Sequence, residues 1–177
     1  MRIVKGRYAG RSLTSPGGKV RPTAEAVRDQ WLSLLEDDLR DARVLDLFAG
    51  SGAVGLEALS RGAASVDFVE NGAPALHALK ANVAALRAKG MTRIFKRDAI
   101  PFVERLEADA YDVALADPPY GSAKLDRVIA QWNRVPFAAV LAFEHDKDHR
   151  LEVKGKRYDF GGPTRITVLR HERRRAP

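Results

Sequence analysis

The tetrapeptide Asp117-Pro118-Pro119-Tyr120 carries the most informative chemistry in the chain, and it follows an apolar run that predicts a buried strand over 112–116. The two prolines fix the backbone and donate no N–H, so the Pro118 carbonyl and the Asp117 carboxylate are held as acceptors. An exocyclic aromatic amine is a poor nucleophile because its lone pair is delocalised, and two acceptors on its hydrogens favour the reactive pyramidal form. The motif therefore predicts group transfer to such an amine, with Asp117 taking up the proton and Tyr120 stacking on an extruded base.

A simple turn is the alternative interpretation of this motif, since Asp-Pro often begins turns at the ends of strands. A second motif upstream argues against it. Asp46–Gly52, with the sequence DLFAGSG, leaves a predicted strand over 44–48 and enters a predicted helix over 53–60. Its glycines allow a sharp turn and a close approach of the backbone to a ligand. Glu70 ends the next predicted strand, where an acid reaches the hydroxyls of a nucleoside ribose.

Two ligands fit this loop. Residues 50–55 match the G-x-G-x-x-G pattern of dinucleotide-binding loops, which is weak by itself. A dinucleotide loop usually places its first glycine directly after the strand, whereas here Asp46 sits in the strand end. S-adenosylmethionine is cationic and has no pyrophosphate, so a carboxylate at Asp46 suits it better. Asp98, after the predicted strand 93–95, can reach an adenine amino group or cap the following helix, and both roles are open at this point.

The charge of the chain is concentrated at its two ends. The net charge is +7, but the first 28 residues hold seven Lys and Arg against one acid, and residues 163–177 hold five Arg against one acid. Two basic ends around a mildly acidic middle favour a polyanion such as nucleic acid over a mere effect on solubility. The absence of Cys excludes disulfide scaffolds and Cys-ligated metal sites. We see no signal peptide or membrane-spanning run, so we expect a cytoplasmic protein.

Strand and helix patterns alternate from residue 44 onward. Strands are expected over 44–48, 65–69, 93–95, 112–116 and 138–143, with a closing antiparallel pair over 157–160 and 165–169. Helices are expected over 53–60, 74–88, 100–106 and 125–132, and a further helix begins at an N-capping Thr23. This alternation predicts an α/β fold, a Rossmann-like mostly parallel sheet with helices on both faces. We expect a basic hairpin and loop extension over 1–22, and a main domain over 23–177.

Together, Asp46–Gly52, Glu70 and Asp117–Tyr120 resemble the Rossmann-like amino-methyltransferases. The blocks Arg2–Arg11, Arg21–Thr23 with Val27-Arg28, and Gly55–Gly62 narrow the resemblance to the RsmD family, bacterial enzymes that methylate guanine N2 in 16S ribosomal RNA. The resemblance covers essentially the whole chain. It implies a class I S-adenosylmethionine-dependent methyltransferase with a seven-stranded sheet, acting on small-subunit 16S rRNA.

The resemblance also implies roles for individual residues. The expected catalytic residues are Asp117, Pro118 and Tyr120. The expected cofactor-binding residues are Asp46, Phe48, Gly50, Ser51, Gly52, Glu70, Asn71, Asp98 and Ala99. The expected substrate-binding residues, which would grip RNA near the active site, are Arg7, Arg11, Arg21, Thr23, Arg28 and Pro119. We expect a monomer with no metal ion and no membrane contact.

The sequence leaves three other functions open. Asp117–Tyr120 does not identify the base, so an adenine-N6 or cytosine-N4 methyltransferase acting on DNA or RNA is possible. A nicotinamide-dependent oxidoreductase built on residues 50–55 would give Asp117–Tyr120 no role. A non-catalytic RNA-binding module would bind RNA without turnover. His145 and His149 have a spacing that suits a metal site, but a solvated polar loop is favoured there.

Overall fold

The computed structural model describes residues 1–17 and 24–171. Its helices are α1 (Glu25–Ser33), α2 (Glu36–Leu39), α3 (Ala53–Ser60), α4 (Ala73–Ala85), the 3-10 turn η1 (Lys89–Met91), α5 (Ala99–Val103) and α6 (Lys124–Arg134). Its strands are β1 (Arg43–Leu47), β2 (Ser65–Glu70), β3 (Thr92–Lys96), β4 (Tyr111–Ala116), β5 (Ala138–Asp146), β6 (Lys156–Asp159) and β7 (Thr164–Arg170).

The strands form one seven-stranded sheet in the order β3-β2-β1-β4-β5-β7-β6. β1 to β5 pair in parallel, and β7 runs antiparallel to both of its neighbours, β5 and β6. The predicted α/β architecture with an antiparallel closing strand is confirmed. The carboxyl ends of β1 to β5 therefore lie along one edge of the sheet, where ligands of open α/β sheets bind.

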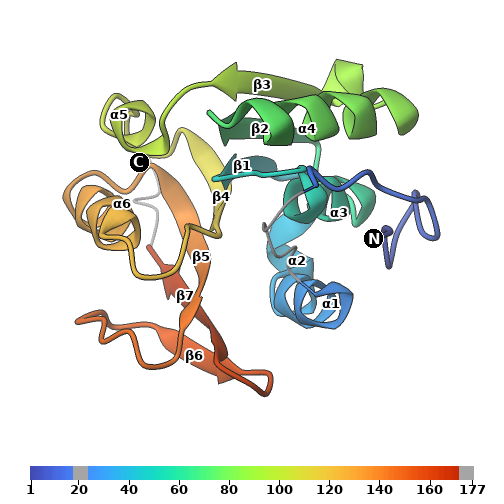
Figure 1. Cartoon of the computed structure of the whole chain (residues 1–177). Helices are drawn as coiled ribbons and strands as arrows, with labels where there is room; N and C mark the ends of the chain where they lie inside the picture. The colour runs from blue at the N-terminus through green and yellow to red at the C-terminus, as the bar shows by residue number, and fades with distance from the viewer. Residues whose placement is uncertain (18–23, 172–177) are drawn as a thin grey trace.

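The sheet is buried on both faces. In Figure 1, α5 and α6 cover one face, whereas α1 to α4 cover the other. Apolar side chains alternate between two cores along each central strand: Val44 faces the α1–α4 side and Leu45 the α5–α6 side. Asp46 follows this alternation and points toward α3. The pleat thus decides which polar residues at a strand end share a face.

The differences from the sequence prediction that have a clear cause concern four element boundaries. α4 ends at Ala85 rather than at residue 88. The chain turns at Arg87, which has a φ of 54°, and not at Gly90 as the sequence predicts. α5 spans Ala99–Val103 instead of 100–106. β5 continues to Asp146, because its last residues pair with β7. Ala24 is the N-cap of α1, and Thr23 lies outside the described residues.

The predicted N-terminal hairpin is reduced to a single bridge between Arg2 and Ser12. Bonds from the Ile3 N–H to the Arg11 carbonyl and from the Gly10 N–H to the Ile3 carbonyl close the loop between them. Ile3 and Leu13 anchor the segment in the core on the α3 side, and Figure 1 shows it beside α3. In the two described stretches, none of the helices has both the length and the apolar character needed to span a bilayer.

Candidate functional site

The two predicted motifs meet at the carboxyl edge of the sheet. Leu47 of β1 and Ala116 of β4 are paired, so Phe48 and Asp117 follow at the same level on neighbouring strands. Asp117 acts electrostatically on both Asp46 and Tyr120 and contributes to the raised pKa of each. The structure therefore brings the glycine loop and Asp117–Tyr120, about 70 residues apart in the chain, into one site.

Two glycines in the loop are required by close packing. Gly52 has a φ of 78°, and a Cβ there would lie 2.3 Å from Leu79 Cδ1. A Cβ on Gly55 would lie 2.7 Å from Asp46 Oδ2. Gly50, with a φ of 57°, instead faces space in which a Cβ would meet nothing within 4 Å. Gly52 and Gly55 therefore let the backbone pack tightly against neighbouring side chains, whereas Gly50 leaves room for a ligand.

Three backbone amides of the loop and the start of α3 already have protein acceptors. Gly50 N–H donates to Glu70 Oε2 at 2.8 Å, Gly55 N–H donates to Asp46 Oδ2 at 2.9 Å, and Gly52 N–H donates to the Ala49 carbonyl at 2.7 Å. A pyrophosphate needs such amides as its own donors. The arrangement therefore disfavours a dinucleotide and leaves an edge rich in carboxylates, which suits a cationic ligand.

Asp46 is only 2% exposed. Burial raises its pKa to about 8; the Gly55 N–H opposes this shift, and Asp117 and Glu70 add to it. Glu70, half-buried at the end of β2, also accepts bonds from the N–H groups of Asn71 and Gly72. These contacts fix both side chains before any ligand is present.

Asp98 caps α5 by accepting a bond at 2.9 Å from the Ile100 N–H. This settles the capping role that the sequence left open. Its second oxygen lies 3.8 Å from Lys124 Nζ, which also lies 5.8 Å from the centre of the Phe48 ring. Phe48 has a φ of 59°, a conformation that is rare for a residue with a side chain. Lys124 was not predicted as a site residue.

The remaining predicted cofactor residues surround this edge. Ser51 is buried, and its carbonyl accepts a bond from Asn82, whose amide also bonds to both the N–H and the carbonyl of Thr14. Asn71 is exposed beside Glu70, and Ala99 is buried at the start of α5. Asn82 thus joins the N-terminal segment to the glycine loop, a link for which the sequence offers no signal.

Tyr120 is held at its hydroxyl while its ring remains accessible. The residue is 48% exposed. Its hydroxyl donates to Glu144 Oε1 at 2.8 Å and lies 3.2 Å from Thr164 Oγ1. Burial, followed by the contact with Glu144, raises the pKa of Tyr120 to about 12, although the bond with Thr164 opposes the shift. An exposed ring fixed at its tip is suited to stacking on a base.

A hollow of about 470 Å³ runs along the loop from Pro118 to Leu125 and reaches Glu144 and His145. Asp117 is not among its lining residues, so the hollow borders the reacting position rather than enclosing it. Pro118 is buried, and Pro119 is exposed on the rim. The Pro119 carbonyl accepts a bond from Ser122 at 2.7 Å, which stabilises the loop.

The prediction of a solvated polar loop around His145 and His149 is wrong for His145. This residue lies in β5, is 3% exposed, and bonds through its ring to Thr167 Oγ1 and the Asp146 carbonyl. Burial lowers its pKa. His149 instead lies 3.3 Å from Asp126. Within residues 1–17 and 24–171, no group of three His, Cys, Asp or Glu side chains could hold a metal ion.

The N-terminal arginines bond to the carboxyl ends of α3 and α4. The Arg7 N–H donates to the carbonyl of Ser60, the last residue of α3, and its guanidinium donates to the Leu59 carbonyl. Arg11 donates to the carbonyl of Ala85, the last residue of α4. α3 begins at the glycine loop, so the end of α3 that Arg7 contacts lies about 12 Å from that loop. Arg11 is closer to the loop than the length of α4 suggests, because Asn82, three residues before Ala85, bonds to the Ser51 carbonyl. Contact of both arginines with RNA near the active site stays a prediction.

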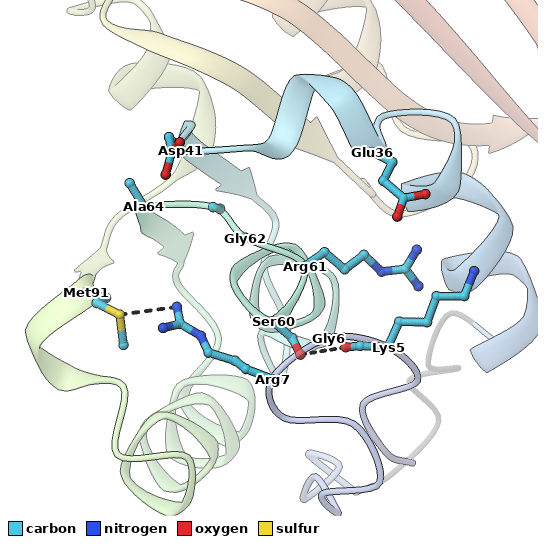
Figure 2. A pocket seen from close by; sticks show the side chains of 11 residues that line it. Lys5, Gly6, Arg7, Glu36, Asp41, Ser60, Arg61, Gly62, Ala64 and Met91 are labelled. Carbon is cyan, nitrogen blue, oxygen red and sulfur yellow. Dashed lines mark hydrogen bonds between the residues drawn. The ribbon is translucent and has the colours of Figure 1, made fainter.

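A second hollow, of about 500 Å³, opens at this far end of α3. Figure 2 shows Lys5, Arg7 and Arg61 around it, with Arg7 approaching the sulfur of Met91 and Ser60 bonded to the Lys5 carbonyl. None of the predicted catalytic residues lines it. It is therefore a surface of the N-terminal segment and not the reaction site.

The structure differs from the prediction that Arg28 contacts RNA. It is 0% exposed, because it pairs with buried Glu57 at 3.4 Å and bonds to the Arg2 carbonyl. Glu57 also accepts bonds from the N–H groups of Val4 and Lys5. Arg28 therefore fastens the N-terminal segment to α3 and cannot reach a phosphate. Arg21 and Thr23 lie outside the described residues.

Comparisons with known proteins agree with this geometry. The profile of the family described as conserved hypothetical protein 95 matches residues 1–159. The chain belongs to this family. The ribosomal RNA small subunit methyltransferase D of Escherichia coli K12 is 36% identical over 130 residues, which are 73% of this chain and 65% of that protein. YlbH of Bacillus subtilis is 30% identical over 85% of each chain. The resemblance to the RsmD family is confirmed.

Two solved structures share the fold of this chain. The Escherichia coli protein yhhF superposes with a TM-score of 0.84 at 29% identity, covering 98% of this chain and 99% of its own. A hypothetical protein of Thermus thermophilus gives 0.80 at 28% identity, covering 97% and 99%. The class I methyltransferase fold is therefore established for this member of the family. The match to methyltransferase D spans just under two thirds of that relative's length.

Proposed function

We propose that the chain is an S-adenosylmethionine-dependent methyltransferase that methylates the exocyclic N2 amine of a guanine in 16S ribosomal RNA. The observation that carries the proposal is the meeting of the glycine loop and Asp117–Tyr120 on neighbouring strands, β1 and β4. The name of the Escherichia coli relative supports ribosomal RNA of the small subunit as substrate. An oxidoreductase gives Asp117–Tyr120 no role.

The residues of the glycine edge fit S-adenosylmethionine. The space beside Gly50 leaves the loop backbone accessible, and Glu70 and Asp98 supply carboxylates after β2 and β3, next to the buried carboxyl group of Asp46 in β1. Such a set suits a nucleoside with a cationic substituent, because its ribose hydroxyls, amines and sulfonium all favour acceptors. The holding residues would be Asp46, Phe48, Gly50, Ser51, Gly52, Glu70, Asn71, Asp98 and Ala99. When bound, the cofactor supplies an electrophilic methyl group.

The chain itself supplies orientation and a proton acceptor. The Asp117 carboxylate and the Pro118 carbonyl accept bonds from the two hydrogens of the amine and make its lone pair available. Fixed positioning of this kind can supply several kcal/mol of the barrier, up to about 7–11 kcal/mol for ideal alignment. Asp117 then receives the proton that the amine loses, directly or through a water. Tyr120 stacks on the base, and Pro119 packs against it from the rim.

RNA binding draws on basic side chains beyond the site. Arg7 and Arg11 are exposed, and each keeps guanidinium N–H groups in addition to the one that caps a helix end. They would contact RNA near the active site, and Thr14, close to Arg11 in the chain, lies against the glycine loop through Asn82. Arg21 and Thr23 are proposed as further RNA contacts on the sequence resemblance alone. We further propose a cytoplasmic monomer that needs no metal ion.

The decisive experiment measures transfer of labelled methyl from S-adenosylmethionine to small ribosomal subunits that lack their native modification. Nucleoside analysis of the product should give N2-methylguanosine at one site. Transfer to naked rRNA, duplex DNA and unmethylated subunits is compared in parallel. Transfer to adenine or cytosine, or to DNA alone, would keep the amine chemistry and overturn the substrate. Cofactor binding without transfer to any of these substrates would favour a binding module.

A variant tests the role of Asp117 separately. Asp117→Ala should abolish methyl transfer while cofactor affinity, measured by calorimetry, stays within about threefold, because Asp117 is placed on the amine. Asp148→Ala, an exposed acid outside the motif, is the matched control. Loss of cofactor affinity in Asp117→Ala would show that this carboxylate belongs to the cofactor site instead.

A further inference from the structure

We propose that Glu144 selects guanine by accepting a hydrogen bond from its N1–H, beside the amine that Asp117 holds. This inference rests on the proposed function, and it deepens it, because Asp117–Tyr120 alone does not distinguish guanine from adenine or cytosine. The structure places Glu144 in β5, next to β4, the strand that leads into Asp117.

The register of β4 and β5 sets the two acids side by side. Ala116 pairs with Phe143, and both side chains lie in the core on the α5–α6 face. Asp117 and Glu144 each come one residue later, so both turn to the opposite face at the carboxyl edge. Neighbouring strands are about 4.8 Å apart. The sheet thus presents two adjacent carboxylates at the reacting position.

Tyr120 connects these carboxylates to the base. Its hydroxyl donates to Glu144 Oε1 at 2.8 Å, and both Asp117 and Glu144 act electrostatically on it. Glu144 is 7% exposed, so its carboxylate is screened from bulk water. A base stacked on the Tyr120 ring would place one edge toward Glu144. Few water molecules would compete for a hydrogen bond made there.

The chemistry of the bases then decides which one fits. In guanine the methylated amine adjoins N1–H, a donor. In adenine and cytosine the ring nitrogen next to the amine, N1 or N3, is an acceptor. In its ionised form the Glu144 carboxylate accepts and cannot donate, so in that form it pairs with guanine and faces a lone pair on either other base. Binding adenine or cytosine would leave a polar group unpaired at a site screened from water. The binding free energy then includes the desolvation penalty of that group as well as the loss of the hydrogen bond.

Other acids near the site do not meet these conditions. Asp126 lies on α6 and is paired with His149 at 3.3 Å. Asp146 Oδ1 accepts a bond from the Asp148 N–H at 2.9 Å, within its own turn. Glu144 alone among these three lies in register with Asp117 and contacts Tyr120.

The experiment compares rRNA carrying guanine at the mapped target position with rRNA carrying 2-aminopurine there. This analogue keeps the 2-amino group but has an acceptor at N1. We expect the wild-type protein to methylate guanine with a kcat/KM at least about tenfold to a hundredfold higher. Glu144→Gln, whose amide can donate to the analogue, should lose activity on guanine and reduce this preference by about tenfold or more.

The matched control is Tyr120→Phe, which removes the contact with Glu144 but keeps the ring. It should lower kcat/KM on both substrates by the same factor. Equal losses in Glu144→Gln would mean that Glu144 only positions Tyr120, and would overturn the inference. If Glu144→Gln does not fold, the wild-type preference alone decides: equal methylation of both substrates rejects the role of Glu144. Failure of wild-type protein to methylate guanine at all would reject the proposed function as well.

Discussion

The carboxylate of Glu70 at the end of β2 accepts a hydrogen bond at 2.8 Å from the backbone N–H of Gly50 in the loop after β1. The same side chain also accepts bonds from Asn71 and Gly72 through its other oxygen. One acid therefore ties together the ends of two neighbouring strands. The loop that would hold a cofactor is fixed by this side chain, which itself remains half-buried at the ligand edge.

We predict that Glu70→Gln weakens binding of S-adenosylhomocysteine by about tenfold to a hundredfold, since a hydrogen bond to a charged group is worth about 1.5–3 kcal/mol. The amide can accept from Gly50 or from Asn71 and Gly72 but has one acceptor oxygen in place of two. Isothermal calorimetry measures the affinity, and Glu107→Gln, an exposed acid distant in the chain from the motifs, is the control. An unchanged affinity would remove Glu70 from the cofactor site.

The docking of the N-terminal segment on α3 makes a second prediction. Gly6 has a φ of 84°, and a Cβ there would lie 1.8 Å from the Ser60 carbonyl oxygen. Gly10 has a φ of 80°, but a Cβ there would meet nothing within 4 Å. Gly10→Ala should therefore cost about 1–2 kcal/mol of unfolding free energy, for the backbone conformation alone.

Gly6→Ala should cost clearly more than Gly10→Ala, because the clash also displaces the bonds that Arg7 and Tyr8 donate to Ser60. Urea unfolding measures both variants, and limited proteolysis shows whether the first residues detach. Equal costs for the two alanine variants would mean that the segment is not seated on α3 as described.

The buried pair of Arg28 and Glu57 makes a third prediction. Arg28→Ala should reduce the free energy of unfolding by about 1–3 kcal/mol, because the bonds of buried Arg28 are lost while Glu57 keeps its pair with Arg61 at 3.0 Å. Arg40→Ala removes an exposed arginine and should change it by less than about 0.5 kcal/mol. At a temperature where Arg28→Ala is folded, the salt dependence of its RNA binding should equal that of wild type. A shallower slope would return Arg28 to the RNA surface.

The sequence predicted the fold well because its signals are local. Apolar runs followed by loops that contain glycine or proline mark β1, β2 and β4, and each lies within a residue or two of its expected range. Boundaries failed where tertiary contacts decide. β5 extends to Asp146 because β7 pairs with it over seven residues, and pairing with a distant strand leaves no trace in the local pattern.

The site was predicted in part for a related reason. Asp46 and Glu70 lie at the ends of β1 and β2 and Asp117 directly follows β4, and their position at the carboxyl edge was predicted because topology fixes where strand ends meet. Lys124 and Asn82 were missed, since their roles depend on helix packing. Arg28 was misassigned to RNA because charge alone does not reveal a buried partner such as Glu57. Glu144 was also missed, although it directly follows the apolar run 138–143, and that position could have indicated a site residue at the carboxyl edge.

The last prediction concerns pH and Asp46. Burial raises the pKa of Asp46 in the folded state to about 8, whereas the pKa of an Asp in the unfolded chain is about 3.9. Between these values the folded state holds the extra proton, so the contribution to stability is fully present below about pH 4 and is lost as pH rises through about 8. Asp46→Asn cannot titrate but keeps an acceptor for the Gly55 N–H. Its unfolding free energy relative to wild type should therefore increase from pH 5 to pH 8.5, as measured by urea unfolding. Asp37→Asn, at an exposed position of α2, should show no such trend. A flat difference for Asp46→Asn would mean that this carboxyl group is ionised in the folded protein across the whole range.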